Sequence, residues 1–375
     1  MELKYGLISV DDHVLETPDV WTARMSKAKW GDRIPHLIEQ ADGSQCWAID
    51  GSMLPLAGNA CAGAAMPDRA INPTRWSEVP PSTYVPSERL RAMDTDGVDA
   101  SVLYPTVAGI AGETFGRITD AELELACVQA YNDWLVEEWS SASPRFIPQC
   151  LVPLAPIEST VREIQRAVAN GHRGAIIPPA LMQLRDLPHI NEPVYDPVWA
   201  VCQEMGVPVC FHAGSSKRLQ FPPYSLTPRL ADALEAVTRP ITDVPIMANL
   251  LFSRILLRFP TVKVVFAESS LAWGAYEIEF ADHEYERQRM HLEGYDLKPS
   301  EMFRRQCYLG GWYDRAGIDE RSFLGVGNLL WETNYPQANS SWPQTGDFVS
   351  RLFEGVPEDE KATILAGNAA QLYKL

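Results

Sequence analysis

Short runs of hydrophobic residues recur along the chain, and each run except the first leads directly into a stretch with helical periodicity. Nearly every position within a run is apolar, which is typical of parallel strands that are buried on both faces. Eight βα units in succession predict an α/β protein with a distorted (β/α)8 TIM barrel. The eight predicted strands are residues 5–10, 99–106, 145–154, 173–179, 207–214, 262–269, 307–312 and 327–336.

Two segments extend beyond the bare barrel. Residues 14–85, between the first strand and its helix, are rich in proline and glycine, and a hairpin is expected at 45–56. Long segments of this kind often form lids or walls of active sites. Residues 343–375 are expected to be terminal packing helices, so that 1–375 forms a single barrel domain with 14–85 as its insertion.

The insertion also contains four tryptophans, namely Trp21, Trp30, Trp47 and Trp76. Two interpretations of these rings remain open. They can anchor the insertion to the barrel, or some of them can form a wall that binds a bulky apolar substrate.

The charge balance narrows the range of partners. With 32 Lys and Arg against 49 Asp and Glu, the net charge is −17, which argues against nucleic acid and against an anionic membrane surface. We find no apolar run long enough to span a membrane and no signal-peptide pattern at the N-terminus. Seven cysteines without paired spacing predict free thiols in a reducing cytoplasm. The apolar positions within 226–258 lead us to expect a homodimer.

Polar residues follow several of the predicted strands, at the end of the barrel where chemistry takes place. Asp11 and His13 are two residues apart, so their side chains point to the same face of the first strand. His212 ends the fifth strand and Glu268 ends the sixth. Each position alone also has a structural interpretation: a solvated pair, a core histidine, or an N-cap for the helix that begins near 271. Together they predict a divalent metal site, with Zn, Mn or Fe as candidates.

Three further residues are candidates for the same rim. Glu16 lies three residues after His13 and is a possible ligand of a second ion. Glu332 and Asn334 end the eighth strand, and both point to one face of it. We therefore predict Asp11, His13, Glu16, His212, Glu268 and Asn334 as metal ligands, and Glu268, Glu332 and Asn334 as catalytic residues.

Four stretches of the chain resemble one enzyme family. They are ISVDDHVLETPDVW, GVPVCFHAG, FPTVKVVFAESSLAWGAYEIEFADHEYER and WETNYPQANSSWP. They look like the amidohydrolase-related family that includes aminocarboxymuconate-semialdehyde decarboxylase. The resemblance implies a barrel with a divalent metal held by Asp11, His13 and His212. It also shows departures: Glu268 replaces a histidine, Asn334 replaces the strand-eight aspartate, and Gln337 replaces the histidine that follows it.

These departures bear on the choice between an oxygenase and a decarboxylase or hydrolase. A neutral amide at Asn334 cannot take a proton from a metal-bound water, which weakens a hydrolytic interpretation. Two histidines with several carboxylates also suit non-haem iron. The favoured expectation is therefore a non-haem diiron monooxygenase that uses O₂ to hydroxylate a bulky, terpenoid-like small molecule. The alternative is a zinc- or manganese-dependent decarboxylase or hydrolase of an aromatic or unsaturated carboxylic acid. A barrel that has lost its metal and only binds a ligand is the third possibility.

Overall fold

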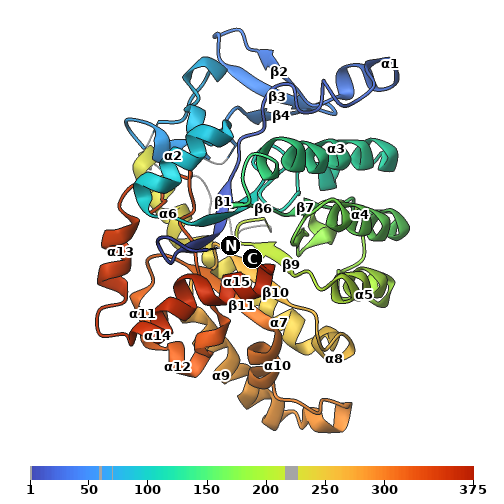
Figure 1. Cartoon of the computed structure of the whole chain (residues 1–375). Coiled ribbons are helices and arrows are strands. Elements are labelled where there is room, and N and C mark those ends of the chain that lie inside the picture. The colour runs from blue at the N-terminus through green and yellow to red at the C-terminus, as the bar shows by residue number, and fades with distance from the viewer. Residues whose placement is uncertain (1, 59–60, 70, 216–226) are drawn as a thin grey trace.

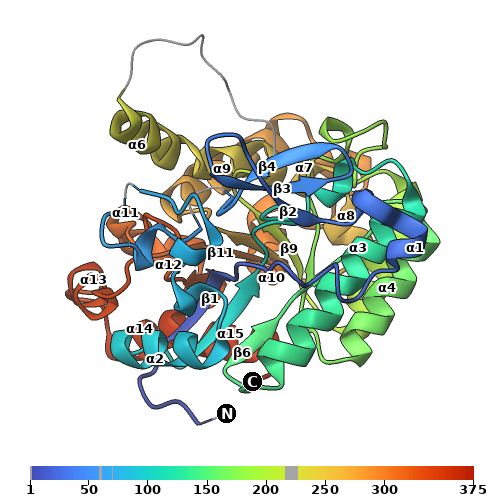
Figure 2. The ribbon, with the colours of Figure 1, turned by 90° about the horizontal axis from the view of Figure 1, so that it is seen from above.

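Parallel strands surrounded by helices form the centre of the molecule (Figure 1, Figure 2). The computed structural model describes residues 2–58, 61–69, 71–215 and 227–375. One arc of the barrel consists of β1 (Ile8–His13), β5 (Ala100–Tyr104) and β6 (Phe146–Pro148). The other arc consists of β7 (Cys150–Leu151), β8 (Ala175–Ile176), β9 (Val209–His212), β10 (Val264–Ala267), β11 (Cys307–Gly311) and β12 (Leu329–Trp331). The predicted TIM barrel is confirmed.

The two arcs meet at two places. β6 and β7 are halves of the single strand predicted at 145–154; β6 pairs with β5 and β7 pairs with β8. On the other side, the segment after β12 continues along β1. The backbone N–H of Asn334 donates to the Asp11 carbonyl at 2.9 Å, and the N–H of His13 donates to the Tyr335 carbonyl at 2.7 Å. The predicted eighth strand is therefore short, but its continuation closes the barrel.

Helices cover the outside of the barrel, as the periodicity predicts (Figure 2). The segment 226–258 is divided where Pro240 and Pro245 interrupt the helical pattern, because proline lacks the N–H that an interior helical position donates. The helices that follow β-strands are α2 (Pro86–Asp96), α3 (Ala121–Trp134), α4 (Ile157–Ala169), α5 (Asp196–Met205), α6 (Pro228–Thr238), α7 (Val244–Phe252), α8 (Ile255–Arg258), α9 (Ala272–Arg287), α10 (Pro299–Gln306), α11 (Arg315–Asp319) and α12 (Arg321–Leu324). The expected terminal helices are α13 (Thr345–Leu352), α14 (Glu358–Ala362) and α15 (Asn368–Tyr373).

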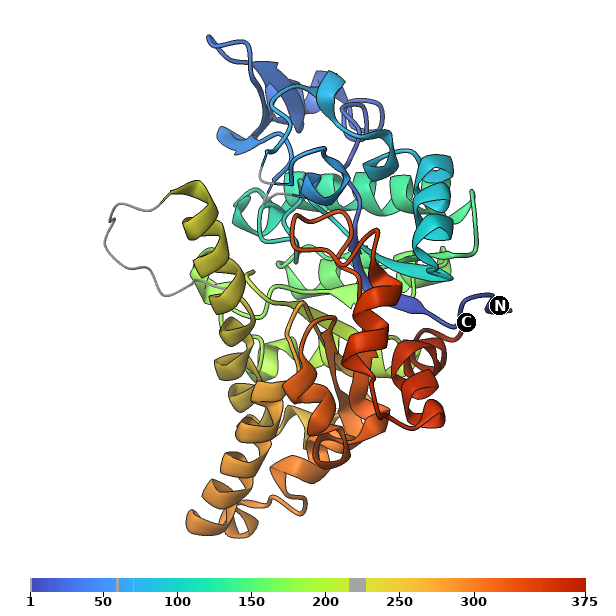
Figure 3. The same cartoon turned by 90° about the vertical axis from the view of Figure 1, so that its left-hand side faces the viewer.

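The insertion after β1 forms a small antiparallel sheet at one end of the molecule (Figure 3). A short helix, α1 (Lys27–Trp30), precedes β2 (His36–Glu39), β3 (Gln45–Ile49) and β4 (Ser52–Pro55). The hairpin expected at 45–56 is the β3–β4 pair. Its two turn residues, Asp50 and Gly51, have φ values of 44° and 82°. Asp-Gly is well suited to such a turn, because both positions need a positive φ.

The tryptophans of the insertion act as anchors. Trp21 and Trp47 are fully buried and meet edge to face, with ring centroids 5.5 Å apart. Trp21 also packs against Phe115 and donates its indole N–H to the Cys127 carbonyl of α3. The anchoring interpretation therefore describes these two rings, whose bulk is used in packing the insertion onto the barrel.

Replacing Trp21 by alanine should destabilise the protein strongly. The change empties a fully buried indole site, and losses of this kind cost about 3–5 kcal/mol in the free energy of unfolding. Denaturant titration of both proteins measures the difference. Trp30→Ala is the matched control, since that ring is only partly buried and should cost less than half as much. Equal losses in the two variants would contradict the anchoring role of Trp21.

Two further observations concern the chain as a whole. All seven cysteines are buried, and none of them forms a disulfide. Within the described ranges, no helix combines the length and the apolar character that a membrane crossing requires.

Candidate metal centre

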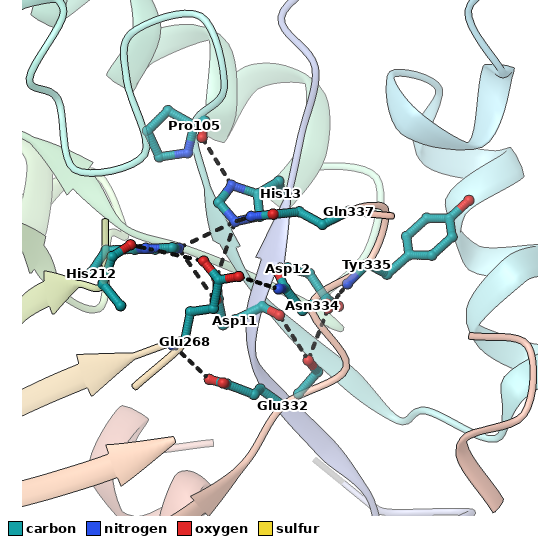
Figure 4. Close-up of polar contacts among 12 residues, drawn as sticks. Asp11, Asp12, His13, Pro105, His212, Glu268, Glu332, Asn334, Tyr335 and Gln337 are labelled. Carbon is teal, nitrogen blue, oxygen red and sulfur yellow. Dashed lines mark hydrogen bonds and ion pairs between the residues drawn. The ribbon is translucent and has the colours of Figure 1, made fainter. Parts of the chain in front are cut away.

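Three side chains converge at the C-terminal end of the barrel strands (Figure 4). Asp11 and His13 come from β1, and His212 comes from the end of β9. His13 Nε2 lies 3.5 Å from one Asp11 carboxylate oxygen, and His212 Nε2 lies 3.3 Å from the other. The two Nε2 atoms are 3.3 Å apart. All three side chains are fully buried, and the structure brings these three of the predicted metal ligands together.

Both imidazole rings are held by backbone carbonyls on their other nitrogen. His13 Nδ1 lies 3.0 Å from the Pro105 carbonyl oxygen, and His212 Nδ1 lies 2.8 Å from the Ala213 carbonyl oxygen. A carbonyl oxygen only accepts hydrogen bonds, so each Nδ1 carries a hydrogen. The Nε2 atoms are thus the ones that face Asp11. Metal-binding histidines are typically oriented by this kind of second hydrogen bond.

The space between Asp11 and the two imidazoles favours a positive charge. Among the described residues, neither buried oxygen of Asp11 has a hydrogen-bond partner, and the imidazole Nε2 atoms are what faces them. Burial by itself lowers the pKa of His212, but the charge of Asp11 and the hydrogen bond to it outweigh burial and raise the pKa to about 9. A proton on His212 Nε2 is therefore favoured when no cation is bound. One carboxylate and two imidazole nitrogens fit a divalent cation, which supplies that charge more fully.

Glu268 lies beside Asp11 and the two histidines, but it pairs with Arg239. Nη1 of Arg239 donates to both of its carboxylate oxygens, at 3.0 and 2.9 Å. Its Oε2 lies 3.8 Å from Nδ1 of His212, on the side of the ring that faces away from Asp11. The structure therefore does not bring Glu268 into the group of three. It also does not cap α9, because Asp314 accepts the backbone N–H groups of Leu271 and Ala272.

Asn334 complements Glu268. Its amide nitrogen donates to Glu268 Oε1 at 3.0 Å and to the side-chain oxygen of Asn339 at 3.0 Å. These two bonds fix the orientation of the amide and leave its buried Oδ1 without a hydrogen-bond partner among the described residues. Asn334 and Glu268 also share a left-handed backbone, with φ values of 55° and 53°. Such values are unusual for residues other than glycine and concentrate at functional sites.

Glu332 and Glu16 were predicted at the same rim, and the structure gives both of them structural contacts. Glu332 Oε2 accepts the backbone N–H of Glu268 at 3.2 Å, and burial together with the charge of Asp11 raises its pKa well above the usual range. Glu16 accepts backbone N–H groups from the loop after β5, donated by Thr106, Val107 and Ala108. Neither carboxylate joins the group formed by Asp11 and the two histidines.

Glu16→Gln should therefore leave the metal content unchanged and lower stability. The amide accepts fewer and weaker bonds from the loop, and a weakened set of buried hydrogen bonds costs about 1–3 kcal/mol. Metal analysis after dialysis and denaturant titration measure the two effects separately. A variant that folds normally but no longer retains its metal would restore Glu16 to the ligand set.

The sequence did not reveal the contacts of several other residues at the centre. Arg239 follows α6 in a segment without any strand-end signal, and it also donates to the Gln337 amide oxygen at 3.0 Å. Gln337 in turn donates its amide N–H to His13 Nε2 at 2.9 Å, a bond that a cation on His13 would replace. Asp12 accepts from Ser9, Thr333 and Ser101, and so connects β1 to both of its neighbours.

A cavity of about 370 Å³ lies next to the centre. Its wall includes Thr106 and Gly214, which follow directly after the carbonyl groups that hold His13 and His212. Its lining combines polar and apolar side chains, and none of the insertion's tryptophans contributes to it. The remaining lining residues are Leu54, Pro55, Gly58, Val107, Gly109, Glu113, Thr114, Arg117, Gln183, Leu184 and Ser215.

The chain is similar in sequence to a known enzyme family and to several of its members. A family model described as amidohydrolase matches residues 65–375. The chain is 24% identical over 310 residues to 2-amino-3-carboxymuconate-6-semialdehyde decarboxylase of Dictyostelium discoideum. The matched region covers 80% of this chain and 79% of that protein. Curated relatives at 23% identity include gamma-resorcylate decarboxylase of a Rhizobium species, covering 76% of this chain and 86% of that protein.

Solved structures agree on the fold. An amidohydrolase from Mycobacterium avium subsp. paratuberculosis superposes with a TM-score of 0.76 at 22% identity, covering 99% of this chain and all of the other. A dihydroxybenzoic acid decarboxylase from a Polaromonas species, solved with manganese and 2-nitroresorcinol, gives a TM-score of 0.67 at 19% identity, with coverage of 99% and 98%. At these identities the structural likeness concerns the fold alone.

Proposed function

The chain belongs to the amidohydrolase family, and from that premise we propose that it removes CO₂ from a small aromatic carboxylic acid with the help of one divalent cation. The cation would be held by Asp11, His13 and His212. The observation that carries this proposal is a fully buried carboxylate and two oriented imidazoles that leave a place for positive charge beside a cavity. The curated relatives named above are decarboxylases, which supports the choice of reaction.

The expectation of a diiron monooxygenase is wrong. The curated relatives named above are decarboxylases, as is the relative that was solved with manganese. In the structure, two of the carboxylates that would have bound a second ion have other partners. Glu268 is paired with Arg239, and Glu16 binds the loop after β5. The charged side chains of Glu113 and Arg117 in the cavity lining likewise favour a polar substrate over a terpenoid-like one.

The residues of the centre would have different roles in such a decarboxylation. A bound divalent cation polarises and positions an oxygen of the substrate. Asp11 compensates its charge, and the Pro105 and Ala213 carbonyls keep the imidazoles in the orientation for binding. Arg239 and Asn334 fix Glu268 at the rim, so that its negative charge cannot compete for the cation. Asn334 Oδ1 is the additional oxygen in this shell that has no other partner.

Manganese and zinc are the cations that we favour. Both bind combinations of carboxylate and imidazole, and one relative of the same fold was solved with manganese. Iron remains chemically compatible with the three ligands, but only as a single ion. The substrate would be a hydroxybenzoate, since a ring hydroxyl beside the carboxylate offers the cation a second oxygen.

A direct assay tests the proposal. The protein, loaded with Mn²⁺ or Zn²⁺, is incubated with a hydroxybenzoate panel of 2-hydroxybenzoate, 2,3-dihydroxybenzoate and 2,6-dihydroxybenzoate, and the released CO₂ is measured. We expect CO₂ and the matching phenol from at least one acid, and loss of both after chelation and dialysis. Turnover that survives complete metal removal would contradict the proposal, as would O₂ consumption without release of CO₂.

The homodimer stays a prediction, now with a defined surface. Leu230, Leu234 and Val237 of α6 lie on one side of the helix and are 56%, 38% and 74% exposed. A two-fold contact through this face would bury them. Light scattering at micromolar concentration should then give twice the 41.8 kDa chain mass, and Val237→Asp should lower the apparent mass. A wild-type protein of single-chain mass would exclude the dimer.

A further inference from the structure

Decarboxylation leaves an electron pair on a carbon atom, and that carbon must receive a proton. Three polar groups near the metal centre do not supply it. Asn334 is an amide and has no acidic proton. Both oxygens of Glu268 accept hydrogen bonds from Arg239, so this side chain is held at the rim by its ion pair. Glu332 lies on the far side of the Glu268 backbone and is fully buried, away from the cavity lining.

Glu113 is the carboxyl group that lines the cavity, within the part of the chain that the structure describes. It lies on the loop between β5 and α3. Thr106 at the start of this loop and Gly214 after β9 share the cavity wall with it. These residues adjoin the carbonyl groups that orient His13 and His212. Glu113 therefore faces the space that lies directly against the supports of both histidines.

The loop holds this carboxyl group in a defined position. Oε2 of Glu113 accepts the backbone N–H of Ala111 at 2.9 Å. Gly109 passes so close that a Cβ atom there would lie 2.5 Å from Oε2, and its φ is 92°. Glu16 holds the beginning of the loop through its bonds to the backbone. A carboxyl group fixed in this way is preorganised for one task, as catalytic groups need to be.

On the basis of the proposed function, we propose that Glu113 is the acid that protonates the substrate carbon when CO₂ leaves. The bond between the ring carbon and the carboxylate carbon breaks, and its electron pair stays on the ring carbon. The O–H proton of Glu113 bonds to that carbon, CO₂ departs, and Glu113 becomes a carboxylate. A proton from solvent restores it before the next turnover.

The surroundings of Glu113 favour the protonated form that this step needs. Burial raises the pKa of Glu113, and the Ala111 N–H group and the charge of His212 oppose this effect only in part. The guanidinium of Arg117 donates to the Glu113 backbone carbonyl and lowers the pKa only slightly. The carboxyl group is thus a better proton donor near neutral pH than an exposed glutamate.

Glu113→Gln tests the proposal, because glutamine keeps the shape and can still accept from the Ala111 N–H. The Mn²⁺-loaded variant and wild type are compared on the best acid of the hydroxybenzoate panel. The second readout is the exchange of the phenol's ring hydrogen in D₂O, which runs the protonation step backwards. We expect turnover and exchange to fall about 10²–10⁴-fold, with metal content and phenol affinity within twofold of wild type. Glu122→Gln, an exposed neighbour outside the cavity, should change neither readout.

Each other outcome is informative. If Glu113→Gln keeps wild-type turnover and exchange, the proposal is overturned while the decarboxylase function stands. If the variant loses phenol affinity together with turnover, Glu113 binds the substrate and is not its proton donor. If the wild-type protein with Mn²⁺ or Zn²⁺ neither releases CO₂ nor exchanges the ring hydrogen, the proposed function fails and the role of Glu113 fails with it.

Discussion

Replacing Asp11 by asparagine should deprive the protein of its metal ion. Asp11 is the one negatively charged group of the three, and both of its oxygens face the imidazoles. Even outer hydrogen-bond partners of metal ligands typically contribute 10–100-fold to affinity, so losing a charged ligand should weaken binding by more than about 100-fold. Metal analysis after dialysis against a weak chelator measures the loss, and turnover should disappear with the metal.

The adjacent aspartate offers a matched control. Asp12 is equally buried, but its carboxylate accepts from Ser9 and Thr333 and does not belong to the group of three. Burial raises its pKa to about 6. Asp12→Asn should retain the metal and lose about 1–3 kcal/mol of stability, since it weakens several buried hydrogen bonds. If Asp12→Asn loses the metal and Asp11→Asn keeps it, the ligand assignment is wrong.

Asn334→Asp should be strongly damaging, although it restores the residue that the resemblance implies at this position. The amide nitrogen of Asn334 donates to Glu268 Oε1 at 3.0 Å and to Asn339. An aspartate would place a second carboxylate against Glu268 and leave both acceptors without this donor. We expect turnover to fall about 10²-fold or more, because small displacements of groups at a reacting centre have effects of this size. Initial rates on the hydroxybenzoate panel measure the change.

A double variant shows whether the two positions are adapted to each other. In Asn334→Asp with Glu268→Gln, the donor and the acceptor exchange places and the total charge is unchanged. The double variant should therefore recover at least about tenfold over Asn334→Asp alone. If the single change leaves turnover intact or raises it, Asn334 is not the partner that holds Glu268.

The pairing of Asn334 with Glu268 gives a structural context for two departures from the resemblance. In the resemblance, an aspartate on strand eight and a histidine on strand six are expected. Here the acceptor is on strand six as Glu268 and the donor is on strand eight as Asn334. Considered separately, each substitution suggested different chemistry. In the structure the two residues form a hydrogen-bonded pair between the two strands.

The barrel itself was accessible from the sequence, because hydrophobic runs and helical periodicity depend on local spacing. The same holds for Asp11 and His13, whose positions two apart on β1 determine that they share a face. The hairpin at Asp50 and Gly51 was likewise predictable, since its turn residues suit a positive φ.

The partners of the acidic residues could not be predicted in the same way. Arg239 lies 29 residues before Glu268, in a segment whose pattern indicates only helix. Glu16 binds a loop about 90 residues further along the chain. A strand-end carboxylate looks like a ligand until its partner is known, and that partner is fixed by the tertiary fold. The sequence alone therefore could not distinguish a metal ligand from a carboxylate that binds another part of the chain.

Anomalous diffraction from crystals soaked in Mn²⁺, recorded near the manganese edge, tests the metal centre most directly. The predicted result is one anomalous peak per chain, with Asp11, His13 and His212 around it and Glu268 still paired with Arg239. A peak elsewhere in the barrel would contradict this centre. Two peaks bridged by Glu16 or Glu268 would contradict the single-ion site as well, and with it the division of roles among these acidic residues.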